Sequence, residues 1–203
     1  DNEISVRREY VHDTLKDYLN LDVIGYKDKD LISFFKKIEK DQTFFFNLVL
    51  ELYDEAFFET QLKEYCCLEK CSITVCWNTR CTVTGGLCSV NRKGKKETNN
   101  IKIQISSTVL YRALKNSKGR QLPIGGLLCN DILECFMMIF EHELVHALID
   151  CFCPDYGHTN FKAPGNFKGK THPSDGHSLT FMSIFNNIFG GKNRFHNLFN
   201  PKK

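Results

Sequence analysis

A His-Glu-Leu-Val-His pentapeptide at residues 142–146 combines residue types and a spacing that can do chemistry. Residues four apart lie on one face of an α-helix, so His142 and His146 can reach the same metal ion. Zinc held by three protein ligands keeps a fourth position for water and lowers the pKa of that water toward neutrality. Glu143 can then take a proton from the water and return it to the leaving amine. The pattern predicts a zinc-dependent peptidase with Glu143 as its catalytic acid/base.

A catalytic zinc site of this kind needs a third protein ligand. His177 stands at the start of an expected final helix, whose apolar face can pack against the helix of His142 and His146. Its position favours His177, but spacing alone leaves other candidates open. These are Asp155, His158, His172 and Asp175. Glu141 and Asp150, beside the pentapeptide, are candidates to hydrogen-bond the ligating imidazoles.

The pentapeptide is expected within a long helix that begins with a capping arrangement. Asp131 and Glu134 have the D-x-x-E spacing of a helix start, and apolar residues continue to about Cys151. An irregular segment of about twenty residues follows, of a length that is usually functional or mobile. The last helix is expected from about 174–176 to the Gly190-Gly191 pair.

Strand patterns precede this helix. Residues 73–77 and 101–105 alternate apolar and polar side chains, as half-buried strands do. Residues 82–90 are rich in β-formers but are interrupted by Gly85-Gly86, which suggests a bulge or a close backbone approach. Together these segments predict a small antiparallel meander.

Helical periodicity before the strands predicts helices over 1–20, 28–40 and 44–62. The 203 residues are 42% hydrophobic and 25% charged, an ordinary globular composition that excludes collagen-like, disordered and coiled-coil chains. No apolar run reaches the roughly 18 residues of a membrane span, and the first residues lack a secretory signal pattern. We expect an α+β protein that does not enter a membrane.

The net charge of +3 is unevenly distributed. Residues 91–120 and 156–203 are strongly basic, whereas 121–155, which holds the pentapeptide, has acidic residues and no Lys or Arg. Basic segments on both sides of a metal site suit a protein that meets a polyanion. Solvated lysine-rich loops explain the same charge pattern equally well.

Ten cysteines leave the redox state open. None forms a CxxC pair, so the sequence contains no zinc ribbon. Several lie in apolar runs, where a free cysteine behaves as a small buried hydrophobic residue. This favours a reduced, intracellular protein, and the alternative is a secreted zinc protease whose cysteines form disulfides.

Four elements in the same order resemble the SprT-like (Spartan) metalloprotease family, over about residues 48–190. The segments that carry the resemblance are Leu52-Tyr-Asp-Glu-Ala-Phe-Phe58-Glu-Thr-Gln-Leu62, Trp77-Asn-Thr-Arg80-Cys-Thr82-Val-Thr-Gly-Gly86-Leu-Cys88, Ile103-Gln-Ile-Ser106, and His142-Glu-Leu-Val-His146 with Asp175-Gly-His177-Ser-Leu-Thr-Phe181. The resemblance implies a zincin-like core in which the last helix carries the third ligand.

The resemblance also implies roles for individual residues. His142, His146 and His177 would bind one catalytic Zn²⁺, with Glu143 as acid/base. The strand of Trp77 would lie at the sheet edge beside the cleft, where an extended substrate adds as a further strand. Trp77 and Arg80 are therefore expected substrate contacts. The implied activity is DNA-dependent cleavage of proteins crosslinked or bound to DNA, by a monomer, and the expected location is intracellular and nuclear.

The chain departs from the family in having no cysteine after Cys153, and so no zinc ribbon after the protease core. Contacts to single-stranded or junction-containing DNA would then fall to the basic segments, through salt-dependent phosphate contacts. The expected contacts are Lys93, Lys95, Lys96, Lys115, Lys118, Arg120, Lys168 and Lys170.

The expected organisation has three parts: an N-terminal helical extension (1–43), an SprT-like metalloprotease domain (44–192) and a basic C-terminal tail (193–203). A non-catalytic DNA-binding module on the same fold is a further alternative. The intact Glu143 argues against it, because a decayed site would have lost its base or a ligand.

Overall fold

The computed structural model describes residues 2–21, 28–91, 99–124, 126–153, 177 and 179–192. The elements are α1 (Asn2–Tyr18), α2 (Asp28–Lys40), α3 (Gln42–Phe58), α4 (Leu62–Leu68), β1 (Cys71–Trp77), β2 (Gly86–Asn91), β3 (Asn99–Ile105), α5 (Ser107–Ser117), β4 (Leu122–Ile124), β5 (Leu127–Cys129), α6 (Ile132–Phe152) and α7 (Leu179–Phe189). The predicted α+β class is confirmed, with N-terminal helices, a small sheet and a histidine-bearing helix. Among the described helices, none combines the length and hydropathy that a membrane span requires.

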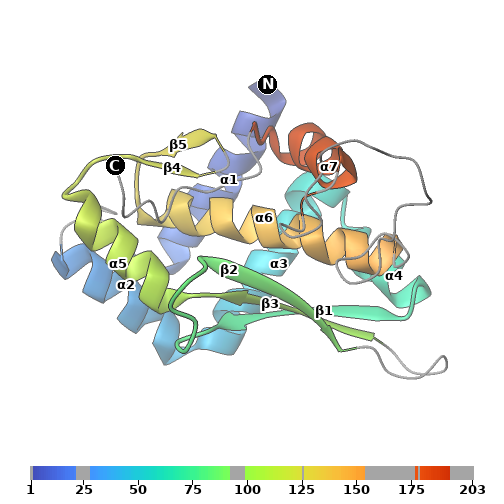
Figure 1. Ribbon diagram of the computed structural model, residues 1–203, viewed down its shortest axis with the longest axis horizontal. Coiled ribbons are helices and arrows are strands. Elements are labelled where there is room, and N and C mark those ends of the chain that lie inside the picture. The colour runs from blue at the N-terminus through green and yellow to red at the C-terminus, as the bar shows by residue number, and fades with distance from the viewer. Residues whose placement is uncertain are drawn as a thin grey trace.

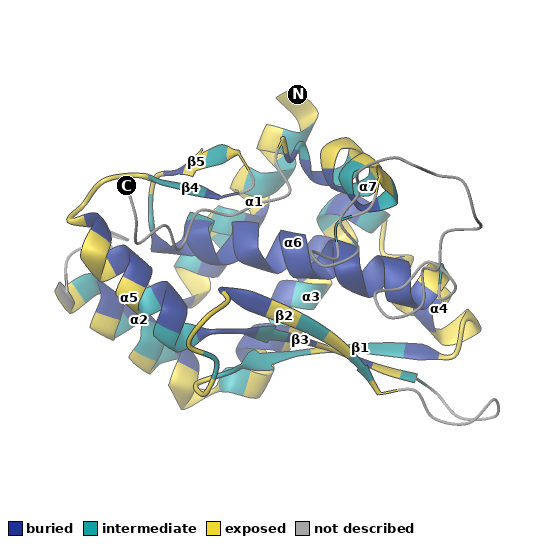
Figure 2. Ribbon diagram, viewed as in Figure 1, coloured by how far each residue is buried: buried dark blue, intermediate teal, exposed yellow. Residues whose placement is uncertain are grey.

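Helix α6 runs through the middle of the molecule, between the three-stranded sheet on one side and α7 with the β4–β5 hairpin on the other (Figure 1). Nearly all of its residues are buried (Figure 2), as expected for a helix that is hydrophobic on every side. The predicted cap is confirmed, since the Asp131 carboxylate accepts the backbone N–H of Glu134 at 2.8 Å. The Glu134 carboxylate in turn accepts the backbone N–H of Asn130. The helix of the pentapeptide is thus fixed at its start and enclosed along its length.

The sheet is mixed, so the prediction of an antiparallel meander is wrong. β3 lies in the centre, parallel to β1 and antiparallel to β2. The isoleucines of β3 are fully buried, because the central strand has a neighbour on each side and α6 packs over it. The 78–85 connection passes the end of β3, where Asn78 donates its backbone N–H to the carbonyl of Ile105. Alternation identified the strands but carried no information about which strands pair.

The helix predicted over 44–62 is present as α3, which ends at Phe58, and α4, which begins at Leu62, was not predicted. Glu59 and Thr60 adopt left-handed φ angles of 54° and 63°, which end α3. The Asp54 carboxylate then accepts the backbone N–H of Leu62 at 2.8 Å and so stabilises the start of α4. Asp54 therefore helps to turn the chain at a place where the sequence has no glycine or proline.

Three further elements, α5, β4 and β5, lie in a stretch for which no element was predicted from the sequence. Ser106 begins α5, because its hydroxyl accepts the backbone N–H of Val109 at 3.0 Å. The helix ends where Lys118 adopts a φ of 52°. β4 and β5 then pair antiparallel as a short hairpin before α6.

Helix α1 packs directly on the rest of the molecule. Its Val11 and Leu15 are fully buried, and it contacts both α3 and α6. The domain boundary predicted after residue 43 falls inside α3. The predicted tail at 193–203 lies outside the described residues.

Candidate metal centre

Two histidines of α6 and one from the segment before α7 converge on one point. His142 and His146 project from the same face of α6, and His177 lies two residues before α7. One ring nitrogen from each histidine lies within 4.8 Å of the other two, and Nε2 of His142 is 2.8 Å from Nε2 of His177. His142 and His146 are buried, and His177 is half-buried. The structure thus brings together the three imidazoles that the sequence singled out.

An aromatic side chain of α7 supports all three imidazoles. Phe181 is fully buried, and its ring centroid lies 4.9 Å from His142, 4.5 Å from His146 and 4.6 Å from His177. Phe185, one turn later on α7, also contacts His142, at 5.8 Å. The apolar face of α7 therefore packs against the histidines of α6, as its periodicity predicted. This packing restricts the rotation of the rings.

The donor set fits a transition metal such as zinc. Three neutral imidazoles are a common ligand set for catalytic zinc, and they also suit copper, iron and nickel. A hard cation such as calcium or magnesium would require oxygen ligands instead. The cluster formed by His142, His146 and His177 could hold a metal ion, and its chemistry does not select zinc alone.

Glu143 lies next to the cluster and against strand β2. Its side chain is buried, which raises its pKa to about 8, while a hydrogen bond from the backbone N–H of Cys88 acts in the opposite direction. A cation held by the nearby histidines would favour the charged carboxylate. The close backbone approach suggested by Gly85-Gly86 is present at Gly86. A Cβ atom there would lie 2.5 Å from Cγ of Glu143.

Glu141 hydrogen-bonds two residues that the sequence did not suggest as its partners. It is fully buried, and its carboxylate accepts hydrogen bonds from the Tyr53 hydroxyl at 3.0 Å and from Nε of Arg8 at 2.8 Å. Sequence reasoning missed Arg8 and Tyr53. No local pattern could have found them, because they lie 133 and 88 residues from Glu141 along the chain.

The strand beside Glu143 is β2, and the strand of Trp77 is at the opposite edge of the sheet. The strand of Trp77 is an edge strand, as the resemblance implies, but it is not the strand against which Glu143 lies. The Trp77 ring packs among Phe35, Phe46 and Phe136, with centroid distances of 5.5, 5.3 and 5.8 Å. Trp77 is half-buried and packs against the hydrophobic core. Arg80 is exposed on the connection between β1 and β2.

Of the predicted nucleic-acid contacts, the structure describes Lys115, Lys118 and Arg120, on α5 and just after it. The others, Lys93, Lys95, Lys96, Lys168 and Lys170, lie outside the described residues, as do Asp155, His158, His172 and Asp175. Lys115 lines an open groove of about 510 Å³ between α2 and α5.

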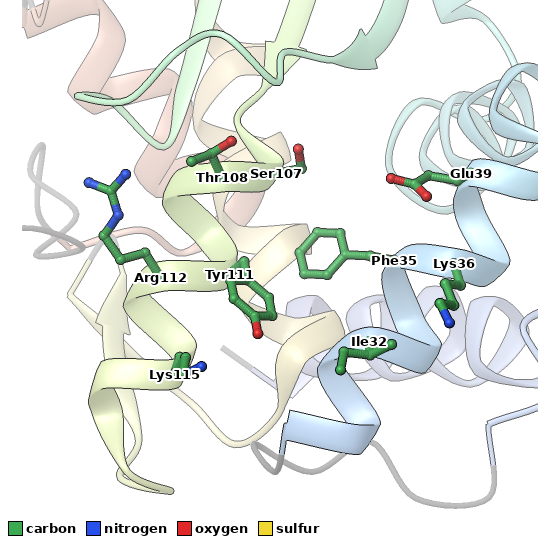
Figure 3. Close-up of a pocket in the computed structure, with 9 residues that line it drawn as sticks. All are labelled: Ile32, Phe35, Lys36, Glu39, Ser107, Thr108, Tyr111, Arg112 and Lys115. Carbon is green, nitrogen blue, oxygen red and sulfur yellow. The ribbon is translucent and has the colours of Figure 1, made fainter.

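Phe35 and Tyr111 point toward one another across this groove (Figure 3), with ring centroids 6.0 Å apart. Lys36, Arg112 and Lys115 also line it, and the Lys115 ammonium lies 5.7 Å from the Tyr111 ring centroid. Glu39 is the one acidic residue among the described lining residues. The α2–α5 groove therefore combines aromatic rings with an excess of positive charge.

All ten cysteines lie in the described ranges, and none forms a disulfide. The thiol of Cys151 donates a hydrogen bond to Sγ of Cys66, with the two sulfur atoms 3.8 Å apart.

Comparison with known proteins adds no family assignment: no family model, curated protein or solved structure matches the chain. The functional interpretation therefore rests on the site itself.

Proposed function

We propose that the chain is a zinc-dependent endopeptidase of the SprT-like type. The observation that carries the proposal is the convergence of His142, His146 and His177 beside the buried carboxylate of Glu143. Three histidine ligands and an adjacent glutamate are the parts that a hydrolytic zinc site requires. The motif resemblance to the SprT-like family supports the same reading.

Each residue of the site has a defined role in this reaction. The three histidines hold the ion, which would supply Lewis-acid activation of water and of the peptide carbonyl. Glu143 accepts the proton that the attacking water loses and returns it to the departing amine nitrogen. The backbone N–H of Cys88 orients the Glu143 carboxylate, and Gly86 leaves the space that this carboxylate occupies.

The substrate would bind as an extended peptide along β2. This strand is an edge of the three-stranded sheet among the described residues, and it borders Glu143. A peptide added there would use main-chain hydrogen bonds, which tolerate many side-chain sequences. Arg80, exposed near the start of β2, is kept as a proposed substrate contact. Trp77 is assigned to the packing beneath the sheet.

We further propose that single-stranded or junction-containing DNA stimulates the activity, with DNA-bound proteins as substrates. The α2–α5 groove supports this, because cationic side chains can pair with phosphates while Phe35 and Tyr111 offer surfaces for unpaired bases. Lys118 and Arg120 follow α5 and extend the positive charge beyond the groove.

The variant Glu143→Gln tests the proposed chemistry. It removes the proton acceptor and leaves the three histidines intact, so we expect one zinc per chain and a fall in casein hydrolysis of about 10²–10⁴-fold. Glu64→Gln, on the exposed surface of α4, is the matched control and should hydrolyse casein like the wild type. Undiminished hydrolysis by Glu143→Gln would refute the mechanism, and a wild-type protein that binds no zinc would refute the site.

The DNA proposal is tested with Lys115→Glu and the matched control Lys63→Glu, which lies on α4 away from the groove. The slope of log affinity against log salt for a single-stranded oligonucleotide should fall in magnitude by about one for each lost phosphate contact. Only the Lys115 variant should show this change and lose stimulation of casein hydrolysis. Equal hydrolysis with and without DNA at all salt concentrations would leave a general zinc peptidase.

A further inference from the structure

One cation from the N-terminal helix contacts both α6, which carries two of the histidines, and α7, which follows the third. The guanidinium of Arg8, on α1, donates from Nε to Oε1 of Glu141 at 2.8 Å and from Nη2 to Oε2 at 2.5 Å. The same Nη2 also donates to the backbone carbonyl of Phe189. The two bonds to Glu141 form a bidentate pair, which fixes the orientation as well as the distance of the two groups.

One partner of Arg8 is next to a histidine, and the other is at the far end of the helix that follows His177. Glu141 directly precedes His142 on α6. Phe189 is the last residue of α7, which begins two residues after His177. A cation at a helix C-terminus interacts favourably with the unpaired carbonyls there. Arg8 thus joins the helix that carries two imidazoles to the helix that follows the third.

The Glu141 carboxylate depends on these contacts. Its side chain has no exposed surface, that of Arg8 is 17% exposed, and the Tyr53 hydroxyl is the other donor to the carboxylate. Removing one partner of a buried ion pair leaves an uncompensated charge, whereas replacing both partners by apolar residues is often neutral for stability. This difference allows the effect of Arg8 on folding to be separated from its effect on the site.

We infer that Arg8 is a positioning residue for the metal centre: it holds α6 and α7 at the spacing at which His142, His146 and His177 converge. The inference rests on the proposed metal site and goes beyond it, because it makes helix α1 a determinant of metal affinity. Outer contacts that orient metal ligands commonly change affinity by about 10–100-fold when removed. Arg8 would act indirectly, because it bonds α6 and α7 and not the imidazoles themselves.

The test measures the zinc dissociation constant of the full chain by competition with a chromogenic chelator. Arg8→Met should weaken zinc binding by about 10-fold or more. Arg7→Met is the matched control, since Arg7 pairs with Glu3 on the exposed side of the same helix, and it should bind zinc like the wild type. The visible spectrum of the Co²⁺-substituted Arg8 variant should differ from that of the wild type, because it reports the geometry of the ligands.

The double variant Arg8→Met/Glu141→Leu distinguishes positioning from folding. It removes both buried charges, so its melting temperature should return toward the wild-type value, while its zinc affinity should stay low because α6 and α7 remain unlinked. Wild-type zinc affinity in Arg8→Met, or affinity that recovers together with stability in the double variant, would overturn the inference and leave the zinc site standing. Absence of zinc binding by the wild type would overturn both.

Discussion

Alanine at position 86 should disable Glu143 without touching a metal ligand. A Cβ atom on Gly86 would lie 2.5 Å from Cγ and Oε1 of Glu143 and 2.8 Å from its Cδ. Ordinary contacts begin near 3.4 Å, so the carboxylate would have to move by about 1 Å. A misplacement of about 1 Å can cost on the order of 100-fold in rate, which corresponds to about 2.7 kcal/mol of transition-state stabilisation.

The assay is kcat/KM for a fluorogenic peptide, with zinc content measured on the same preparation. Gly119→Ala is the matched control, because a Cβ there meets nothing within 4 Å but its φ of +83° is unfavourable for alanine. It should lower stability by about 1–2 kcal/mol and leave kcat/KM unchanged. Full activity in Gly86→Ala would show that the Glu143 carboxylate is not needed where the structure places it. Loss of zinc together with activity would show that the substitution acts on the histidines.

Two further predictions concern pH and metal. The imidazole of His12 contacts the carboxylates of Asp131 and Asp13 at 2.9 and 3.0 Å, and the hydrogen bond to Asp131 is the main cause that raises its pKa to about 9. Since the pKa of His12 is raised on folding, the protonated imidazole stabilises the folded chain fully below about pH 6.5, and this stabilisation is lost as pH rises through 9. It amounts to at most about 3 kcal/mol of the free energy of unfolding. Urea denaturation at a series of pH values should show the loss in the wild type but not in His12→Gln. With free zinc at about 100 times its dissociation constant, the melting temperature should be about 5–10 °C higher than after the metal is removed with a chelator. An unchanged melting curve would contradict the proposed site.

Local signals predicted the parts of the fold that depend on neighbouring residues. The Asp131 cap and the spacing of His142 and His146 act within one or two helical turns, so the sequence sufficed to find α6 and two of the three histidines. The end of the last helix was also found, since Gly190 adopts a φ of 62°. His177 required the family resemblance as well, because several other side chains could have served.

Contacts between distant segments could not be read from the sequence. Alternation in β1, β2 and β3 is the same whichever strand is central, so the mixed order was missed. The pairing of Arg8 with Glu141 joins two helices 133 residues apart, and neither residue has a local pattern that indicates a partner. Helix α5 was missed for a different reason. Its apolar positions Val109, Leu110, Ala113 and Leu114 fit a helix, but the glycines and proline that follow favoured an irregular interpretation.

The three histidines lie on two chain segments separated by 31 positions, from His146 to His177. An ion that binds all three is a reversible crosslink that closes the loop between His146 and His177. Closing this loop lowers its conformational entropy, and the metal-free chain does not have that cost. In the absence of metal, α7 would be held mainly by its phenylalanines and by Arg8, and it should be the least protected of the described helices that pack on α6. Amide exchange in α7 would then report the metal occupancy of the site without any substrate.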